Sequence, residues 1–226
     1  MKRKFQHIAY LLMVAAVLIS CGEKKQTSEF PDWAWADFQR PEGINPIVSP
    51  DTTTVFYCPM RQDSVAWESS DTFNPAATIY DGKVVVLYRA EDNSAVGIGS
   101  RTSRLGYAYS DDGLHFNRMT VPVFYPADDN QKELEWPGGC EDPRVAVTDD
   151  GLYVMLYTQW NRKQARLAVA TSRDLQIWEK YGPAFAKAYG GRFFDEFSKS
   201  ASIVTKLVDG KQVIAKIDGK YWTCLW

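Results

Sequence analysis

Histidine is nearly absent from this sequence, whose 226 residues contain only His7 and His115. A Ser-His-Asp triad or a histidine-based metal site therefore has almost no residues from which to form. The four cysteines include no CxxC pair, so there is neither a zinc motif nor a disulfide framework. We expect no metal and no cofactor, and we interpret Cys58, Cys140 and Cys224 as buried thiols or at most one bridge.

Excess charge of one sign is also missing, because 26 Lys and Arg residues stand against 28 Asp and Glu residues for a formal net charge of -2. This balance gives no electrostatic argument for binding nucleic acid. Beyond residue 20, no apolar run is long enough for a transmembrane helix. The composition is otherwise that of a globular protein, with 45% hydrophobic and 14% aromatic residues. We interpret the aromatic residues mainly as core, with platforms for sugar rings as the alternative.

The first 31 residues are interpreted as targeting and tether rather than fold. Basic residues 2–4 precede an apolar run over residues 8–20, which has the length of a signal peptide within residues 1–20. The sequence LISCG around Cys21 resembles a bacterial lipobox, in which Cys21 is lipidated; an ordinary signal peptide with a chance cysteine is the alternative. Residues 21–31 are polar and are expected to be a tether. We therefore expect a bacterial lipoprotein, periplasmic or outer-membrane anchored, that touches the membrane only through its lipid.

Two long segments, residues 74–118 and 142–180, have the same order of strands and turns. In each, an apolar strand after a proline is followed by an Asp-Gly turn, a tyrosine-containing strand, an R-L-x-x-A strand and a Ser-x-Asp turn. Asp-Gly between β-rich runs predicts hairpins. A third copy with two Asp-Gly turns begins at Lys199. Four short strands in a repeat of roughly sixty to seventy residues are typical of a β-propeller blade, and a β-sandwich is the alternative.

The segment GGCEDPR, residues 138–144, opens the second repeat and contains two adjacent carboxylates. Its glycines allow a close approach of the backbone to a ligand, and Pro143 is expected to hold Asp142 in an extended conformation. Because successive residues of an extended segment point to opposite faces, we expect one of Glu141 and Asp142 to face a pocket and the other to pair with an arginine. A surface turn with a Glu-Arg pair is the alternative.

Seven motifs in this order together resemble glycoside hydrolase family 130. They are FNPA (73–76), LYRAEDN (87–93), SRLGYAYSDDGLHF (103–116), GCEDPR (139–144), LAVATSRDLQIWEK (167–180), the Lys199-Ser200 pair and GKYW (219–222). The resemblance covers about residues 70–222 and implies an all-β, five-bladed propeller that acts on β-mannosides with inversion, as a phosphorylase or a hydrolase. Residues 72–226 would form about half of that ring to three blades, after an N-terminal extension over residues 32–71.

The resemblance also implies a role for Asp142 as the general acid, which protonates the glycosidic oxygen. Asn74 and Arg89 match positions that look like donors to the mannose hydroxyls. Glu91 and Asp92 lie in the same loop and could also bind the mannose hydroxyls, or both could be solvated loop acids. Cations of the site would hold phosphate in a phosphorylase. The residues expected to contact sugar or phosphate are Asn74, Arg89, Asp92, Arg104, Glu141, Arg144 and Lys199, and Arg144 could instead pair with Glu141.

An extracytoplasmic location favours hydrolysis of a β-mannoside or a mannan-derived oligosaccharide, because a sugar phosphate released there would have to be imported. A phosphorylase that uses inorganic phosphate as co-substrate and a non-catalytic sugar-binding lipoprotein are the alternatives. The sequence contains no further blades that could supply a catalytic base. We therefore expect an incomplete fragment, inactive alone, with a second polypeptide that completes the ring as the alternative.

The lipobox interpretation is tested by changing Cys21 to Ala, which removes the thiol that would carry the lipid. We expect the variant to lose membrane association in detergent partitioning and to lose the lipid mass in mass spectrometry. The matched variant Cys224→Ala should partition like the unchanged chain. Unaltered membrane association of Cys21→Ala would contradict the interpretation.

Overall fold

The computed structural model describes residues 40–225. Contacts divide the chain after Pro41, and the interactions discussed below lie in the unit that begins at Glu42. The expected segments 1–20 and 21–31, with Cys21, and the beginning of the expected extension lie outside the described residues. Within residues 40–225, no helix has the length and apolar character needed to cross a bilayer.

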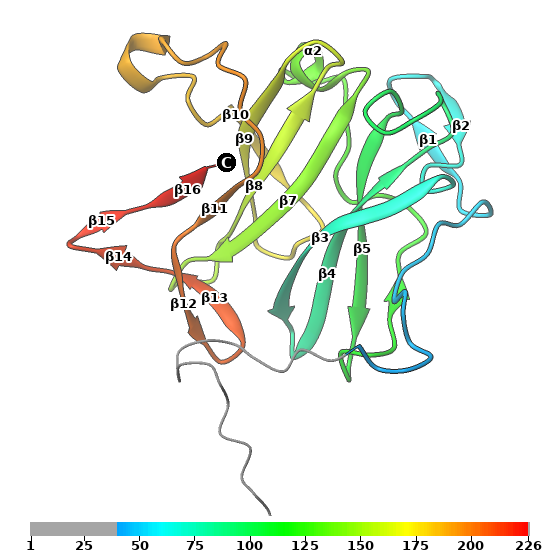
Figure 1. Cartoon of the computed structure of the whole chain (residues 1–226), viewed down its shortest axis with the longest axis horizontal. Helices are drawn as coiled ribbons and strands as arrows, with labels where there is room; N and C mark the ends of the chain where they lie inside the picture. Colours follow the sequence, from blue (N-terminus) through cyan, green and yellow to red (C-terminus); the bar gives the residue numbers. More distant parts are fainter. Residues whose placement is uncertain (1–39, 226) are drawn as a thin grey trace, which may run out of the picture. The chain divides into compact units, whose positions relative to one another are not determined.

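The described chain is all-β, as the repeats predict, and its strands form two successive antiparallel units (Figure 1). The first unit pairs its neighbours in the order β3 (Asp71–Tyr80), β4 (Lys83–Glu91), β5 (Ser103–Ser110) and β6 (Asn117–Arg118). The second pairs them in the order β7 (Gly139–Val147), β8 (Tyr153–Trp160), β9 (Ala165–Ser172) and β10 (Glu179–Pro183). Each unit thus has the four-stranded order that the sequence repeat predicts.

The remaining strands are short. They are β1 (Phe56–Cys58), β2 (Asp63–Val65), β11 (Ala201–Ile203), β12 (Thr205–Val208), β13 (Lys211–Ile214), β14 (Lys216–Ile217), β15 (Lys220–Tyr221) and β16 (Thr223–Leu225). The hairpins β12–β13 and β14–β15 confirm both predicted Asp-Gly turns of the third copy. The described strands do not close into a ring, so the propeller and its number of blades stay predictions. Two short helical segments complete the described part, α2 (Lys132–Glu135) and a 3-10 segment (Ala188–Gly191).

Large apolar side chains of both units meet in one core, where Leu87 of β4 and Met155 and Tyr157 of β8 are almost fully buried. A second cluster joins the expected N-terminal extension to the first unit, because Trp67 packs on Tyr88 with ring centroids 6.3 Å apart. The aromatic side chains of these two clusters serve the core. The described cysteines are free thiols, of which Cys58 and Cys140 are buried and Cys224 is exposed.

Gly138 and Gly139 stand where the second unit crosses the first. The Ser103 amide donates to the Gly138 carbonyl over 2.8 Å, and Ser103 pairs with Gly139 in parallel register. A Cβ atom on Gly139 would lie 2.2 Å from the Ser103 carbonyl oxygen, and the residue has a φ of +120°. From the sequence, these glycines are expected to bring the backbone close to a ligand, but they bring it close to β5 instead.

Asp142 is not extended, contrary to the expectation from Pro143. Its φ is +51°, and the pairing of β7 with β8 shifts register between Glu141 and Arg144. The reason is a β-bulge, which frees Asp142 from the ladder, and the tolerance of Asp for left-handed backbone. Because the bulge breaks the alternation of side chains, Glu141 and Asp142 can turn toward the same neighbours.

The crossing of β5 and β7 predicts a large loss of stability for Gly139→Ala. The added methyl would force two backbones apart and would strain a left-handed residue, each of which costs about 1–3 kcal/mol. Gly151→Ala is the matched control, because Gly151 also has a positive φ but a Cβ atom added there would meet no other atom within 4 Å. Urea unfolding should show a clearly greater loss for Gly139→Ala, and equal losses would contradict this account of the crossing.

Candidate functional site

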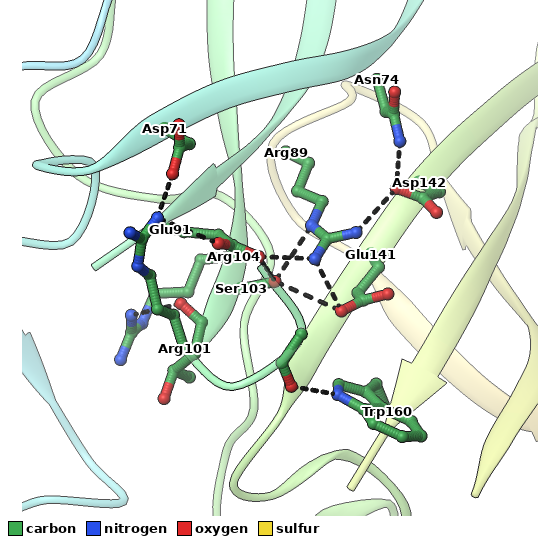
Figure 2. A network of polar contacts seen from close by, with 12 residues as sticks. Asp71, Asn74, Arg89, Glu91, Arg101, Ser103, Arg104, Glu141, Asp142 and Trp160 are labelled. Carbon is green, nitrogen blue, oxygen red and sulfur yellow. Dashed lines mark hydrogen bonds and ion pairs between the residues drawn. The ribbon is translucent and has the colours of Figure 1, made fainter. Parts of the chain in front are cut away.

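Arg89 is the centre of a buried polar cluster between β4 and β7 (Figure 2). Its guanidinium contacts three carboxylates, with Nη2 2.5 Å from Glu91 Oε1 and 2.9 Å from Glu141 Oε1, and Nη1 3.1 Å from Asp142 Oδ1. Its Nε donates to Ser103 Oγ over 3.0 Å. The Arg89 side chain is 2% exposed, so this is a desolvated group of charges in which each member depends on the others.

Asp142 is also held from the first unit. Asn74 Nδ2 donates to Asp142 Oδ1 over 2.8 Å. Asn74 has a φ of +46°, precedes Pro75, and stands at a register shift in the pairing of β3 with β4. The two repeats therefore present an Asx-Pro bulge each, and the two bulge side chains bond to one another.

Lys199 approaches the same carboxylates from the segment before β11. Its Nζ lies 3.0 Å from Glu141 Oε2 and 3.6 Å from Asp142 Oδ2. The Lys199 side chain is 42% exposed, whereas those of Glu141 and Asp142 are almost fully buried. Lys199 is thus a solvent-facing cation of the cluster, and Asn74 is exposed as well.

The pKa values of Glu141 and Asp142 are shifted in opposite directions from their ordinary values. Burial acts to raise the pKa of Asp142, but the hydrogen bond from Asn74 and the charges of Arg89 and Lys199 outweigh it and hold that pKa below its ordinary value. Burial raises the pKa of Glu141 above its ordinary value, despite the opposing charges of Arg89 and Lys199. Without a ligand, a proton that enters the pair is therefore held more readily by Glu141 than by Asp142.

Arg101 and the loop after β4 extend the cluster outward. Arg101 forms an ion pair with Asp71 of β3, and its Nη1 lies 3.6 Å from Glu91 Oε2. The same loop is fastened at Gly99, whose carbonyl accepts a 2.7 Å hydrogen bond from Trp160 Nε1 (Figure 2). The loop beside the Arg89 cluster is thus tied to both units.

Three other residues predicted to contact sugar or phosphate, Asp92, Arg104 and Arg144, lie outside the Arg89 cluster. Arg104 and Asp92 are buried and paired with each other, with Arg104 Nη1 2.9 Å from Asp92 Oδ2. Burial acts to raise the pKa of Asp92, but the charge of Arg104 and the hydrogen bonds from Ser94 and Arg104 outweigh it and hold that pKa below its ordinary value. Neither Arg104 nor Asp92 has a contact with Asp142 among the interactions of the described residues, and Asp92 is not a solvated loop acid.

Arg144 donates from Nη1 to the carbonyls of Pro143 and Pro75, over 2.9 and 3.3 Å. The alternative pairing with Glu141 is therefore not formed, because Glu141 is held by Arg89 and Lys199. Arg144 links the two Asx-Pro bulges through their prolines.

The sequence does not predict four residues that contact the Arg89 cluster or its loop, namely Ser103, Arg101, Asp71 and Trp160. Ser103 directly precedes the R-L-x-x-A motif, and its place at the start of a strand was the signal available. Asp71 pairs in register with Glu91, which could have been found only by extending β3 upstream of the FNPA motif. Within residues 40–225, no group of three or more His, Cys, Asp or Glu side chains is arranged to hold a metal ion.

Replacement of Arg89 by Met is predicted to cost about 3–5 kcal/mol of unfolding free energy at neutral pH, because it leaves buried carboxylates without their cation. The ionised form of Asp142, whose pKa is lowered, contributes stability above its ordinary pKa, and that contribution is lost in the variant. The deficit should therefore persist down to about pH 4 and shrink below it, as the pH falls toward the lowered pKa of Asp142 and that carboxyl takes up its proton.

Urea unfolding at neutral pH and below about pH 4 measures this effect. Arg173→Met is the control, because Arg173 forms an exposed pair with Asp150, and its loss should change little. A deficit for Arg89→Met that is small at neutral pH, or that grows on acidification, would contradict the proposed dependence.

Comparison with known proteins places this geometry in a family. The family model for glycoside hydrolase family 130, described as beta-1,4-mannooligosaccharide phosphorylase, matches residues 39–224. A 1,2-beta-oligomannan phosphorylase from Thermoanaerobacter sp. (strain X514) is 36% identical over 152 residues, which are 66% of this chain and 46% of the relative. The chain spans about half the length of the curated relatives it matches.

Solved structures agree with this comparison. A crystal structure from Bacteroides thetaiotaomicron VPI-5482 is 97% identical, with a TM-score of 0.85 over 88% of this chain and 57% of that chain. A second structure is 68% identical, with a TM-score of 0.84 over 87% of this chain and 55% of that chain. It is described with the statement that this family of mannoside phosphorylases contains glycoside hydrolases that target beta-1,2 mannosidic linkages in Candida mannan. This chain therefore belongs to glycoside hydrolase family 130.

Proposed function

We propose that the protein to which this site belongs cleaves β-1,2-mannosidic bonds with inversion, with Asp142 as the general acid. The observation that carries the proposal is the buried Asp142 carboxylate, oriented by Asn74 and Arg89 and covered by Lys199. A carboxyl fixed in this way can deliver a proton to one position. The names of the relatives supply the β-1,2 linkage and the sugar.

The electrostatics of the free site restrict how Asp142 can act. Because its pKa is lowered, Asp142 is ionised at neutral pH, and a general acid must hold a proton. Lys199 is an exposed contact, so a sugar that displaces its ammonium removes one of the charges that lower this pKa. With that pKa raised, Asp142 can take up a proton from solvent and pass it through a hydroxyl of the bound sugar to the glycosidic oxygen, which is the relay that the family resemblance implies for the phosphorylases.

The two Asx-Pro bulges support a propeller as the frame of this site. In such a ring, Asn74 and Asp142 would occupy equivalent places on the inner strands of successive blades and face a common channel. Asn74 and Arg89 would then orient both the acid and a mannose hydroxyl. The remaining wall of the channel, with any base, would come from the part of the longer relatives that this chain does not match.

We propose water as the acceptor of the mannosyl group. The 68% identical structure, described in connection with glycoside hydrolases, supports this choice, and so does the expected extracytoplasmic lipoprotein location. Three of the predicted cations, Arg89, Arg104 and Lys199, are also engaged with carboxylates rather than free to bind phosphate.

Phosphorolysis is the second candidate function. The descriptions of the family model and of the Thermoanaerobacter relatives all name phosphorylases, which favours inorganic phosphate as the acceptor. Arg144 supports it structurally, because its guanidinium donates only to backbone carbonyls among the interactions of the described residues. An arginine fork of this kind suits a phosphate oxyanion.

Product analysis with β-1,2-mannobiose tests the proposal. Mannose formed without phosphate supports hydrolysis, and mannose 1-phosphate formed only with phosphate supports phosphorolysis. In a full-length version of the enzyme, Asp142→Asn should lower turnover about 10²–10⁴-fold. Some folding stability should be lost as well, because the ionised Asp142 carboxylate pairs with the buried Arg89. Asp63→Asn is the control, since Asp63 is an exposed acid on β2 that accepts a hydrogen bond only from the neighbouring Ser64 amide among the described residues.

Because this chain matches 57% of the 97% identical Bacteroides protein, turnover is measured for both, with the matching aspartate changed in the longer one. Turnover is expected in the longer protein. If Asp142→Asn and its counterpart keep normal turnover on a substrate with a poor leaving group, Asp142 is not the acid.

A further inference from the structure

Three hollows meet at the segment Gln176–Trp178, which follows β9. They have volumes of about 380, 420 and 510 Å³; the first two share Gln176, and the first and third share Ile177 and Trp178. Each lies in the size range of small-molecule sites. We call the surface formed by these three hollows the Trp178 surface.

Two of the three hollows of the Trp178 surface lie at the far end of the strands from Asp142. One hollow is lined by Tyr80, at the end of β3, whereas Asn74 is near the beginning of that strand. Six residues of extended chain span roughly 20 Å. Another hollow includes Leu152, just before β8, while Asp142 is near the beginning of β7 (Figure 1). These two hollows are therefore separate from the site around Arg89.

Aromatic rings line all three hollows. Tyr80, Tyr107 and Tyr109 line one of them. Tyr125 and Trp178 line the next, and Trp178 and Tyr181 the third, where Tyr181 is 58% exposed. Tyr107 is buried, and Tyr80, Tyr109 and Trp178 are partly buried against the core, whereas Tyr181 is exposed. The accessible parts of these rings offer flat apolar platforms, and the phenol and indole groups add polar edges.

The charges of this surface offer no unpaired cation, and its lining includes the further acids Asp81, Asp174 and Glu179. Its three cations are each paired with a carboxylate. Lys83 lies 2.9 Å from Asp111, Lys180 lies 3.1 Å from Asp129, and Arg173 lies 2.9 Å from Asp150. Phosphates and nucleic acids require uncommitted cations, so the paired charges favour an uncharged ligand.

Polar groups suited to hydroxyls remain between the rings. The exposed side chain of Gln176 has no hydrogen-bond partner among the described residues, and it lies where two hollows join. Asn130 uses only its Oδ1, which accepts from Gln131, so its amide donors are not engaged among the described residues. An amide both donates and accepts, as a sugar hydroxyl does.

We infer that the Trp178 surface is a second carbohydrate-binding site, which holds a neutral oligosaccharide several rings long away from the site of bond cleavage. That the sugars are β-linked mannose units rests on the proposed function. A glycan chain held there would stay close to the protein while other parts of it reach Asp142, which raises the effective concentration of cleavable bonds.

Two tryptophan indoles make the two sites distinguishable in one titration. Trp178 Nε1 donates to the Leu175 carbonyl over 3.0 Å, and Trp160 Nε1 donates to Gly99 beside the Arg89 cluster. The ¹⁵N-labelled chain is titrated with β-1,2-mannotetraose, with cellotetraose as the control sugar. Trp178→Phe and Trp160→Phe assign the two indole signals.

A saturable shift of the Trp178 indole with mannotetraose is expected, and Tyr181→Ala should weaken it about tenfold. Tyr57→Ala is the matched control, because Tyr57 is 62% exposed on β1, and it should leave the shift unchanged. If only the Trp160 indole moves, the second site is overturned while the proposed function stands. If only the Trp178 indole moves, the second site stands, and the proposed function is judged by turnover in the longer Bacteroides relative. If neither moves, the second site is overturned as well.

Discussion

The pairing of one buried arginine with three carboxylates determines the arrangement of the candidate site. Arg89 brings together acids from β4 and β7, which belong to different units. Charges removed from water are stabilised only when their partners are correctly placed, so Arg89 fixes the spacing of the two units at this level. The opposite pKa shifts of Glu141 and Asp142 follow from the same arrangement. Both acids pair with Arg89 and Lys199, but only Asp142 accepts a hydrogen bond from Asn74.

The backbone of the fold was largely readable from local chemistry. The Asp-Gly pairs predict the hairpins, and Tyr80 pairs with Lys83 across one of them. The direction of Asp142 was not readable, because it depends on a bulge set by the pairing of β7 with β8. A rule for the residue before proline describes an isolated chain, whereas a ladder can release a residue and leave it in left-handed backbone.

Site membership was partly predictable, since Asn74, Arg89, Glu141 and Lys199 all contact Asp142 or its immediate partners. Arg104 shows the limit of the same reasoning. It has the charge expected of a ligand contact, but it is buried against Asp92 and Cys58. Sequence spacing places a residue on a strand, whereas its depth depends on what packs over it, here the segment that contains β1.

The matching bulges of β3 and β7 show how one backbone design can supply unlike chemical groups. Both occur before a proline, both hold a left-handed residue, and their side chains bond to each other. If the two repeats arose by duplication of an ancestral segment, the geometry was copied together with the sequence. The two bulge residues differ only in the end of the side chain, which is an amide in Asn74 and a carboxylate in Asp142. That difference turns two equal positions into a donor and an acceptor, so the asymmetry of the site requires no asymmetry of the backbone.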